Sequence, residues 1–148
     1  MKKHRALAAV LLLIGTVSGT ASQAANLRPI THEDVWLAKR ISSPRVSPDG
    51  RRIVFLVTEP AYDDKEKAAD LWIVPADGSA PARRLTNSRG AESDVAWSED
   101  GARIVFSTKR EGDEASQIYT LDLVGGGEAR RLTDAAQGAR SPVLSPDG

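Results

Sequence analysis

The 148-residue sequence predicts an all-β fold built from a repeated four-stranded antiparallel unit. A Ser-x-Asp-Gly tetrapeptide occurs three times, ending at Gly50, Gly101 and Gly148, so its copies lie 51 and 47 residues apart. The pentapeptide Ala-Arg-Arg-Leu-Thr occurs twice, ending at Thr86 and Thr133. Units of this length, with short strands between turns, are typical of the blades of a β-propeller. We therefore expect propeller blades in an incomplete ring.

Each unit is expected to contain four short strands. The Ser-x-Asp-Gly turn follows the first strand, and its glycine supplies the left-handed conformation that a bulged hairpin needs. The second strand is apolar on both faces and must therefore be covered on both faces. Helical repeats of similar length are disfavoured by the β-branched runs and Asp-Gly turns, and a sandwich would not require such faithful repetition. In the first unit the strands are expected at 44–47, 52–58, 71–74 and 82–85.

The N-terminal segment has the pattern of a secretory signal peptide. Lys2, Lys3 and Arg5 precede nine apolar residues at 6–14, and small or polar residues follow as far as Ala24. The apolar run is much shorter than the roughly 20 residues that span a bilayer. We expect cleavage after Ala24, export to the periplasm or the cell exterior, and no membrane attachment of the mature chain.

A short helix that extends to Arg40 is expected before the first blade, because Thr31 and Asp34 fit a capping box and the apolar residues 35–38 follow. The sequence ends in the turn of a third unit, so we expect a longer protein. The expected organisation is a signal peptide at 1–24, a helical lead-in at 25–42, blades at 43–92 and 93–139, and the start of a third blade at 140–148.

Composition excludes several function classes. The chain has 20 basic and 20 acidic residues, and removal of residues 1–24 leaves 17 against 20, a formal charge of −3. This balance argues against a nucleic-acid partner, which normally requires a basic excess. Cysteine is absent, which excludes disulfides, thiolate metal sites and cysteine nucleophiles.

The sequence offers no catalytic, cofactor-binding or metal-ligating residue, and no cofactor is expected. His32 is the single histidine of the expected mature chain, and no Gly-x-Ser-x-Gly nucleophile motif occurs. The glycines at 125–127 lack the Lys-Ser/Thr of a phosphate loop, and the aspartates before glycine lack the alternating carboxylates of a calcium loop.

Residues 27–148 resemble the start of exported serine peptidases of the prolyl oligopeptidase family, in the branch of acylaminoacyl peptidases and dipeptidyl aminopeptidases. The resemblance implies an N-terminal propeller over a C-terminal α/β-hydrolase domain that carries a Ser-Asp-His triad. It also implies that the propeller restricts access so that short peptides are the substrates. None of the family's catalytic positions maps onto this chain. The matching segments are 30–36, 45–50, 55–60, 70–74 and 83–86.

Two other functions fit the repeats. TolB-like periplasmic propellers share the Ser-Pro-Asp-Gly and Arg-Arg-Leu-Thr elements and bind partners without catalysis, although they resemble one another in carrying a separate domain before the propeller. An exported scaffold propeller with no defined ligand is the other alternative. The enzyme hypothesis predicts a Gly-x-Ser-x-Gly motif downstream, followed by Asp and His. The binding hypotheses predict a chain that ends where the ring closes.

Overall fold

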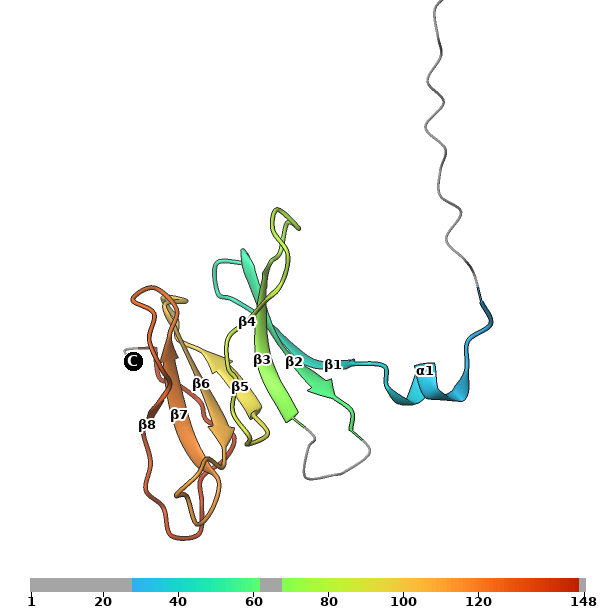
Figure 1. The fold of residues 1–148 in the computed structure, drawn as a ribbon. Coiled ribbons are helices and arrows are strands. Elements are labelled where there is room, and N and C mark those ends of the chain that lie inside the picture. The colour runs from blue at the N-terminus through green and yellow to red at the C-terminus, as the bar shows by residue number, and fades with distance from the viewer. Residues whose placement is uncertain (1–27, 62–67, 147–148) are drawn as a thin grey trace, which may run out of the picture.

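The computed structural model describes residues 28–61 and 68–146, which form two four-stranded antiparallel sheets and one helix (Figure 1). The first sheet contains β1 (Arg40–Val46), β2 (Arg52–Glu59), β3 (Ala68–Pro75) and β4 (Arg83–Arg84). The second contains β5 (Ser93–Trp97), β6 (Arg103–Thr108), β7 (Gln117–Asp122) and β8 (Arg130–Arg131). Strands adjacent in sequence are adjacent in each sheet, so each sheet is one complete meander. The predicted all-β blade architecture is confirmed, and the ring is open in the described chain.

The helix α1 (His32–Trp36) has the predicted capping box. The Thr31 hydroxyl accepts a hydrogen bond from the Asp34 amide at 3.2 Å, and the Asp34 carboxylate accepts one from the Thr31 amide at 2.8 Å. The helix ends at Trp36 and does not reach Arg40, because Arg40 already pairs with Thr58 in the sheet. Strand β1 thus begins at Arg40, three residues before residue 43, where the first blade was expected to begin. No helix in the described ranges is long and apolar enough to cross a membrane.

The two Ser-x-Asp-Gly turns have the same hydrogen bonds in both blades. The Ser47 hydroxyl donates to Asp49 Oδ1 at 2.6 Å and accepts from the Arg52 amide at 2.9 Å. Ser98 makes the equivalent bonds at 2.6 and 2.9 Å. Both serines are buried, so these hydrogen bonds satisfy a hydroxyl group that water does not reach. These serines are therefore turn formers, as their position in the motif predicts.

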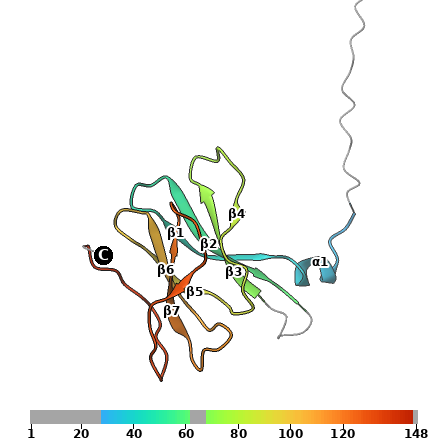
Figure 2. The ribbon, with the colours of Figure 1, turned by 60° about the vertical axis from the view of Figure 1, so that its left-hand side comes forward.

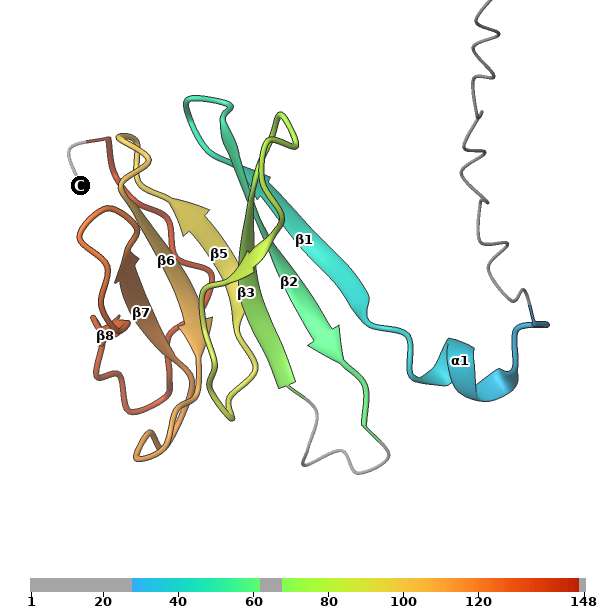
Figure 3. The ribbon, with the colours of Figure 1, turned by 45° about the horizontal axis from the view of Figure 1, so that its top comes forward.

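The two sheets lie side by side and share one hydrophobic core (Figures 2 and 3). A second contact joins β5 to β1 and to the start of β2. The Trp97 indole donates to the Arg45 carbonyl at 3.0 Å, and the Arg52 guanidinium lies 5.3 Å from the centre of the Trp97 ring. The buried core side chains are Val54, Leu56, Leu71, Ile73, Val95, Ile104, Phe106, Tyr119 and Leu121.

A left-handed residue marks the start of every unit. Ser43 and Asp94 have φ values of 51° and 52° at the register shifts of β1 and β5, and Ser141 has a φ of 54° at the equivalent place in the third unit. The described residues 140–146 form no strand, although they were expected to begin a third blade. β1 and β5 are strands because β2 and β6 pair with them, and no described segment pairs with 140–146. The predicted signal peptide and its cleavage site lie outside the described residues.

Candidate functional site

In each blade a threonine just after the fourth strand, Thr86 or Thr133, is hydrogen-bonded to the third strand. We call this arrangement the threonine clasp. The Thr86 hydroxyl accepts a hydrogen bond from the Leu71 amide at 2.9 Å and lies 3.5 Å from the Asp70 carboxylate. Thr133 repeats this with the Ile118 amide at 2.9 Å and donates to the Gln117 amide oxygen at 2.7 Å. The threonine of the Arg-Arg-Leu-Thr repeat therefore fastens the end of the blade to its third strand. This part of the polar network belongs to the fold.

The segment that connects the two blades carries a feature that does not recur, the carboxyl group of Glu92. Glu92 is 2% exposed, and its Oε1 accepts a hydrogen bond from the Ser88 hydroxyl at 2.7 Å. Arg110 Nη2 lies 4.0 Å from the same oxygen, while Glu92 Oε2 has no hydrogen-bond partner in the described chain. Burial, together with the nearby negative charge of Asp70, raises the pKa of Glu92 to about 7, against the lowering effect of Ser88, Thr86 and Arg110. This carboxyl therefore loses its proton at a higher pH than an ordinary glutamate, near neutrality.

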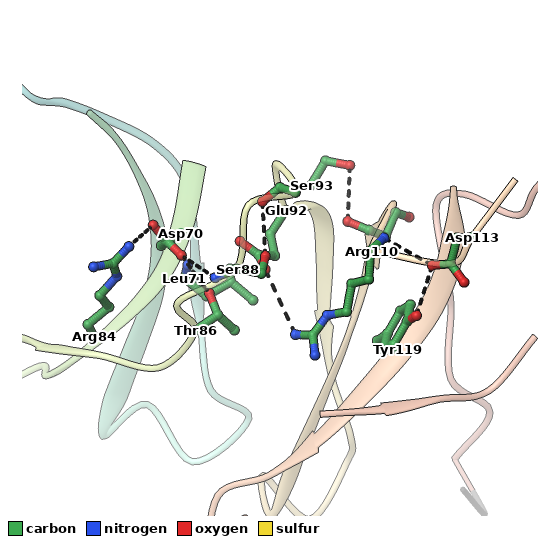
Figure 4. A network of polar contacts seen from close by, with 12 residues as sticks. Asp70, Leu71, Arg84, Thr86, Ser88, Glu92, Ser93, Arg110, Asp113 and Tyr119 are labelled. Carbon is green, nitrogen blue, oxygen red and sulfur yellow. Dashed lines mark hydrogen bonds and ion pairs between the residues drawn. The ribbon is translucent and has the colours of Figure 1, made fainter. Parts of the chain in front are cut away.

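Arg110 is held in place by the second blade. Its guanidinium lies 4.7 Å from the centre of the Tyr119 ring, and its backbone amide donates to Asp113 at 3.0 Å. Figure 4 shows the side chain between Glu92 and Tyr119, with its Nε unpartnered among the described residues. Burial opposes ionisation of Asp113, but hydrogen bonds from Arg110, Tyr119 and Arg131 outweigh it and lower the pKa of Asp113. A charged Asp113 thus fixes the loop from which Arg110 projects.

An open cleft of about 790 Å³ lies beside this network. It is formed by the connector at 88–90 and the loop at 109–111. The two segments approach closely, since a Cβ atom on Gly90 would lie 2.3 Å from the Lys109 carbonyl oxygen. The cleft is lined by Ser88, Arg89, Gly90, Lys109, Arg110 and Glu111, so three cationic side chains face one exposed carboxylate.

The sequence did not identify this junction. Glu92 and Arg110 stand 18 residues apart in no recognised motif, and only the fold brings them together. One signal was available: in the repeat, Ala139 occupies the position of Glu92.

His32, the histidine considered for a triad, stacks on Trp36 within α1 with ring centres 6.3 Å apart. No three His, Asp or Glu side chains of residues 28–61 and 68–146 are grouped as a metal site.

Comparison with known proteins gives the family. Residues 32–148 match the family model described as the PD40 TolB β-propeller domain. An uncharacterized peptidase of Bacillus subtilis, YuxL, is 34% identical over 80% of this chain, and dipeptidyl-peptidase 5 of Porphyromonas endodontalis is 30% identical over 80%. The chain spans 18% and 17% of the length of these two relatives.

A solved structure shows the same fold. TolB of Acinetobacter baumannii is 27% identical with a TM-score of 0.54, and the match covers 71% of this chain and 24% of that one. The two four-stranded blades, the sequence repeat and the family match all indicate a β-propeller domain. The resemblance to peptidase propellers that the sequence predicted is confirmed by the two relatives named as peptidases. The chain belongs to the PD40 family of TolB-type β-propeller domains.

Proposed function

We propose that this chain is the N-terminal propeller part of an exported serine peptidase that hydrolyses short peptides. The catalytic α/β-hydrolase domain lies in a part of the protein outside this chain and is the chain's direct partner. The observation that carries the proposal is the match of 80% of the chain to two proteins named as peptidases, at 34% and 30% identity.

The role of the chain in that enzyme is to exclude large substrates. The described residues contain no histidine except His32, which is stacked in α1, so they supply no triad. They do supply two internally braced blades, because the turn serines Ser47 and Ser98 and the threonines Thr86 and Thr133 are each hydrogen-bonded within their own blade. Propeller blades around a central channel admit what fits through that channel. Short extended peptides fit, and folded proteins do not.

Export is part of the proposal. The basic residues before the apolar run at 6–14 and the small residues up to Ala24 support a signal peptide. A mature chain that begins at Ala25, found by N-terminal sequencing of the protein from the envelope or medium, is the expected result. An intact Met1 on the protein recovered there would contradict cleavage after Ala24.

A binding propeller without enzymatic activity is the second candidate. The structure of TolB from Acinetobacter baumannii favours it, since the identity of 27% and TM-score of 0.54 join this chain to a protein not named as a peptidase. The peptidase relatives match at higher identity and over more of the chain. We therefore place the peptidase first.

The test uses the complete gene product from its native source. The extract is labelled with a fluorophosphonate probe for active serine hydrolases, and labelled bands are searched for peptides of residues 25–148. A labelled band of about 70 kDa, the size of a propeller with a hydrolase domain, supports the proposal. A heat-denatured extract is the control, because the probe requires an activated serine. An unlabelled protein of propeller size alone would reject the peptidase and favour the binding propeller.

A further inference from the structure

The charges of the cleft between the blades are not required by the repeat. The connector is fixed by a hydrogen bond from the Glu92 amide to the Ala69 carbonyl at 2.9 Å, and the next connector has the same bond, from Ala139 to Ser116, at 2.7 Å. An alanine at this position thus suffices for the backbone hydrogen bond that fixes the connector. In the second strand of the first blade, the positions of Lys109 and Arg110 are held by a threonine and a glutamate, Thr58 and Glu59.

The cleft has a net positive charge, because Arg89, Lys109 and Arg110 line it together with a single carboxylate, that of Glu111. Arg89 and Lys109 are exposed and make no ion pair within the described chain. Arg110 lies between Tyr119 and Glu92, but its closest approach to the Glu92 carboxylate is 4.0 Å, too long for a direct hydrogen bond. Its planar guanidinium therefore keeps capacity for a second, external anion.

We propose that the cleft lined by 88–90 and 109–111 binds an anionic group, and that this group is the terminal carboxylate of a short peptide. The inference rests on the proposed function, in which short peptides are the substrates and each carries one such carboxylate. Guanidinium and ammonium groups are suited to a carboxylate, with Arg110 as the oriented donor and Arg89 and Lys109 as flexible ones. A volume of about 790 Å³ accommodates a few terminal residues of a peptide.

Glu92 makes this binding sensitive to pH. The groups that face it are Asp70 from β3, which is ion-paired with Arg84 from β4, the hydroxyls of Thr86 and Ser88, and Arg110 from the second blade. When Glu92 is neutral, Arg110 has no charged partner at this junction and binds an external carboxylate. When Glu92 loses its proton, the internal carboxylate competes for the same guanidinium. Affinity for the peptide is therefore expected to fall as the pH rises through neutrality.

The test measures binding to the complete gene product by isothermal titration calorimetry. The probes are an N-acetylated tetrapeptide of D-alanine, chosen because peptidases specific for L-residues do not cleave it, and the same peptide with a terminal carboxamide. We expect the acid to bind about tenfold more tightly than the amide, the effect of one charge-assisted contact. The double substitution of Arg89→Gln and Lys109→Gln should reduce this preference, because only Arg110 then remains to bind the carboxylate. Arg83→Gln, an exposed arginine on β4, is the control and should leave it unchanged.

Several outcomes would overturn the inference. These are equal binding of acid and amide, or a preference that the double substitution leaves undiminished in a protein with the parent melting curve. Inorganic phosphate that occupies the cleft more tightly than the peptide acid would also overturn it, because the site would then serve phosphate. Glu92→Gln supplies a second readout, and it should abolish the loss of affinity between pH 6 and 8. Fluorophosphonate labelling is measured separately, so a failure here is distinct from a failure of the peptidase proposal.

Discussion

Replacement of Glu92 by glutamine should make the blade junction more stable at alkaline pH and leave it unchanged at acidic pH. Burial raises the pKa of Glu92 from 4.5 to about 7, so the folded state holds a proton that the unfolded state releases between these values. The stabilisation from this group is complete below pH 4.5 and is lost as the pH rises through 7. A shift of that size corresponds to about 3 kcal/mol. Glutamine has the shape of the protonated acid and does not titrate.

The measurement is amide hydrogen exchange of peptides from β3 and β5, followed by mass spectrometry on the complete protein. This reports the free energy of opening at the junction itself and does not require the whole protein to unfold in one step. Parent and variant are compared at the same pH, from 5 to 8, so that the intrinsic exchange rate cancels. The difference should grow with pH toward about 3 kcal/mol in favour of Glu92→Gln.

The matched control is Glu99→Gln, because Glu99 is exposed in the turn between β5 and β6. Its opening free energy should differ from that of the parent by a constant amount across the same range. The carboxylates with lowered pKa values, such as Asp49 and Asp100, are present in every variant and cancel. A flat difference between parent and Glu92→Gln from pH 5 to 8 would refute the reasoning, since Glu92 would then be ionised throughout.

Three further substitutions test the packing of the blades. Gly90→Ala should destabilise the protein by about 1–3 kcal/mol, measured by urea unfolding, because the new Cβ would lie 2.3 Å from the Lys109 carbonyl oxygen. Thr133→Val should cost about 1–3 kcal/mol and speed exchange of the Ile118 amide, which loses its acceptor; unchanged exchange would show that the clasp is not formed. Trp97→Phe keeps the ring but removes the hydrogen bond to Arg45, so a loss of about 1 kcal/mol is expected in thermal unfolding, and no loss would show that the bond contributes nothing.

The sequence predicted the blades well because their determinants are local and repeated. Turn chemistry at 47–50 and 98–101 depends on residues within six positions of one another, and the two copies specify the same hydrogen bonds. The helix start was predictable for the same reason, since Thr31 and Asp34 are three residues apart. The helix end was not, because the competing interaction of Arg40 is with Thr58 in another strand.

The junction was beyond sequence reasoning because its chemistry depends on burial. Glu92, Arg110 and Tyr119 come from a connector, a loop and a strand, and nothing in their spacing indicates that they meet. Charged residues in connectors are usually solvated, and the sequence gives no means of telling that this carboxyl is enclosed by both blades. Its raised pKa follows from that enclosure and could be derived only from the fold.

Comparison of equivalent positions in the repeat distinguishes residues that every blade needs for folding from residues with a role in one blade alone. A position is structural where different residues make the same contact in both blades. The side-chain oxygens of Asp70 and Gln117 are an example, because each is contacted by the threonine hydroxyl at the end of its own blade. At Glu92 and Ala139 the backbone bond is the same, but only the glutamate adds a buried charge, and burial of a charge opposes folding unless the charge is well paired. The pairing with Arg110 at 4.0 Å is incomplete. A destabilising group at a position where alanine suffices is better explained by binding than by folding, and the adjacent cationic cleft is where that binding would occur.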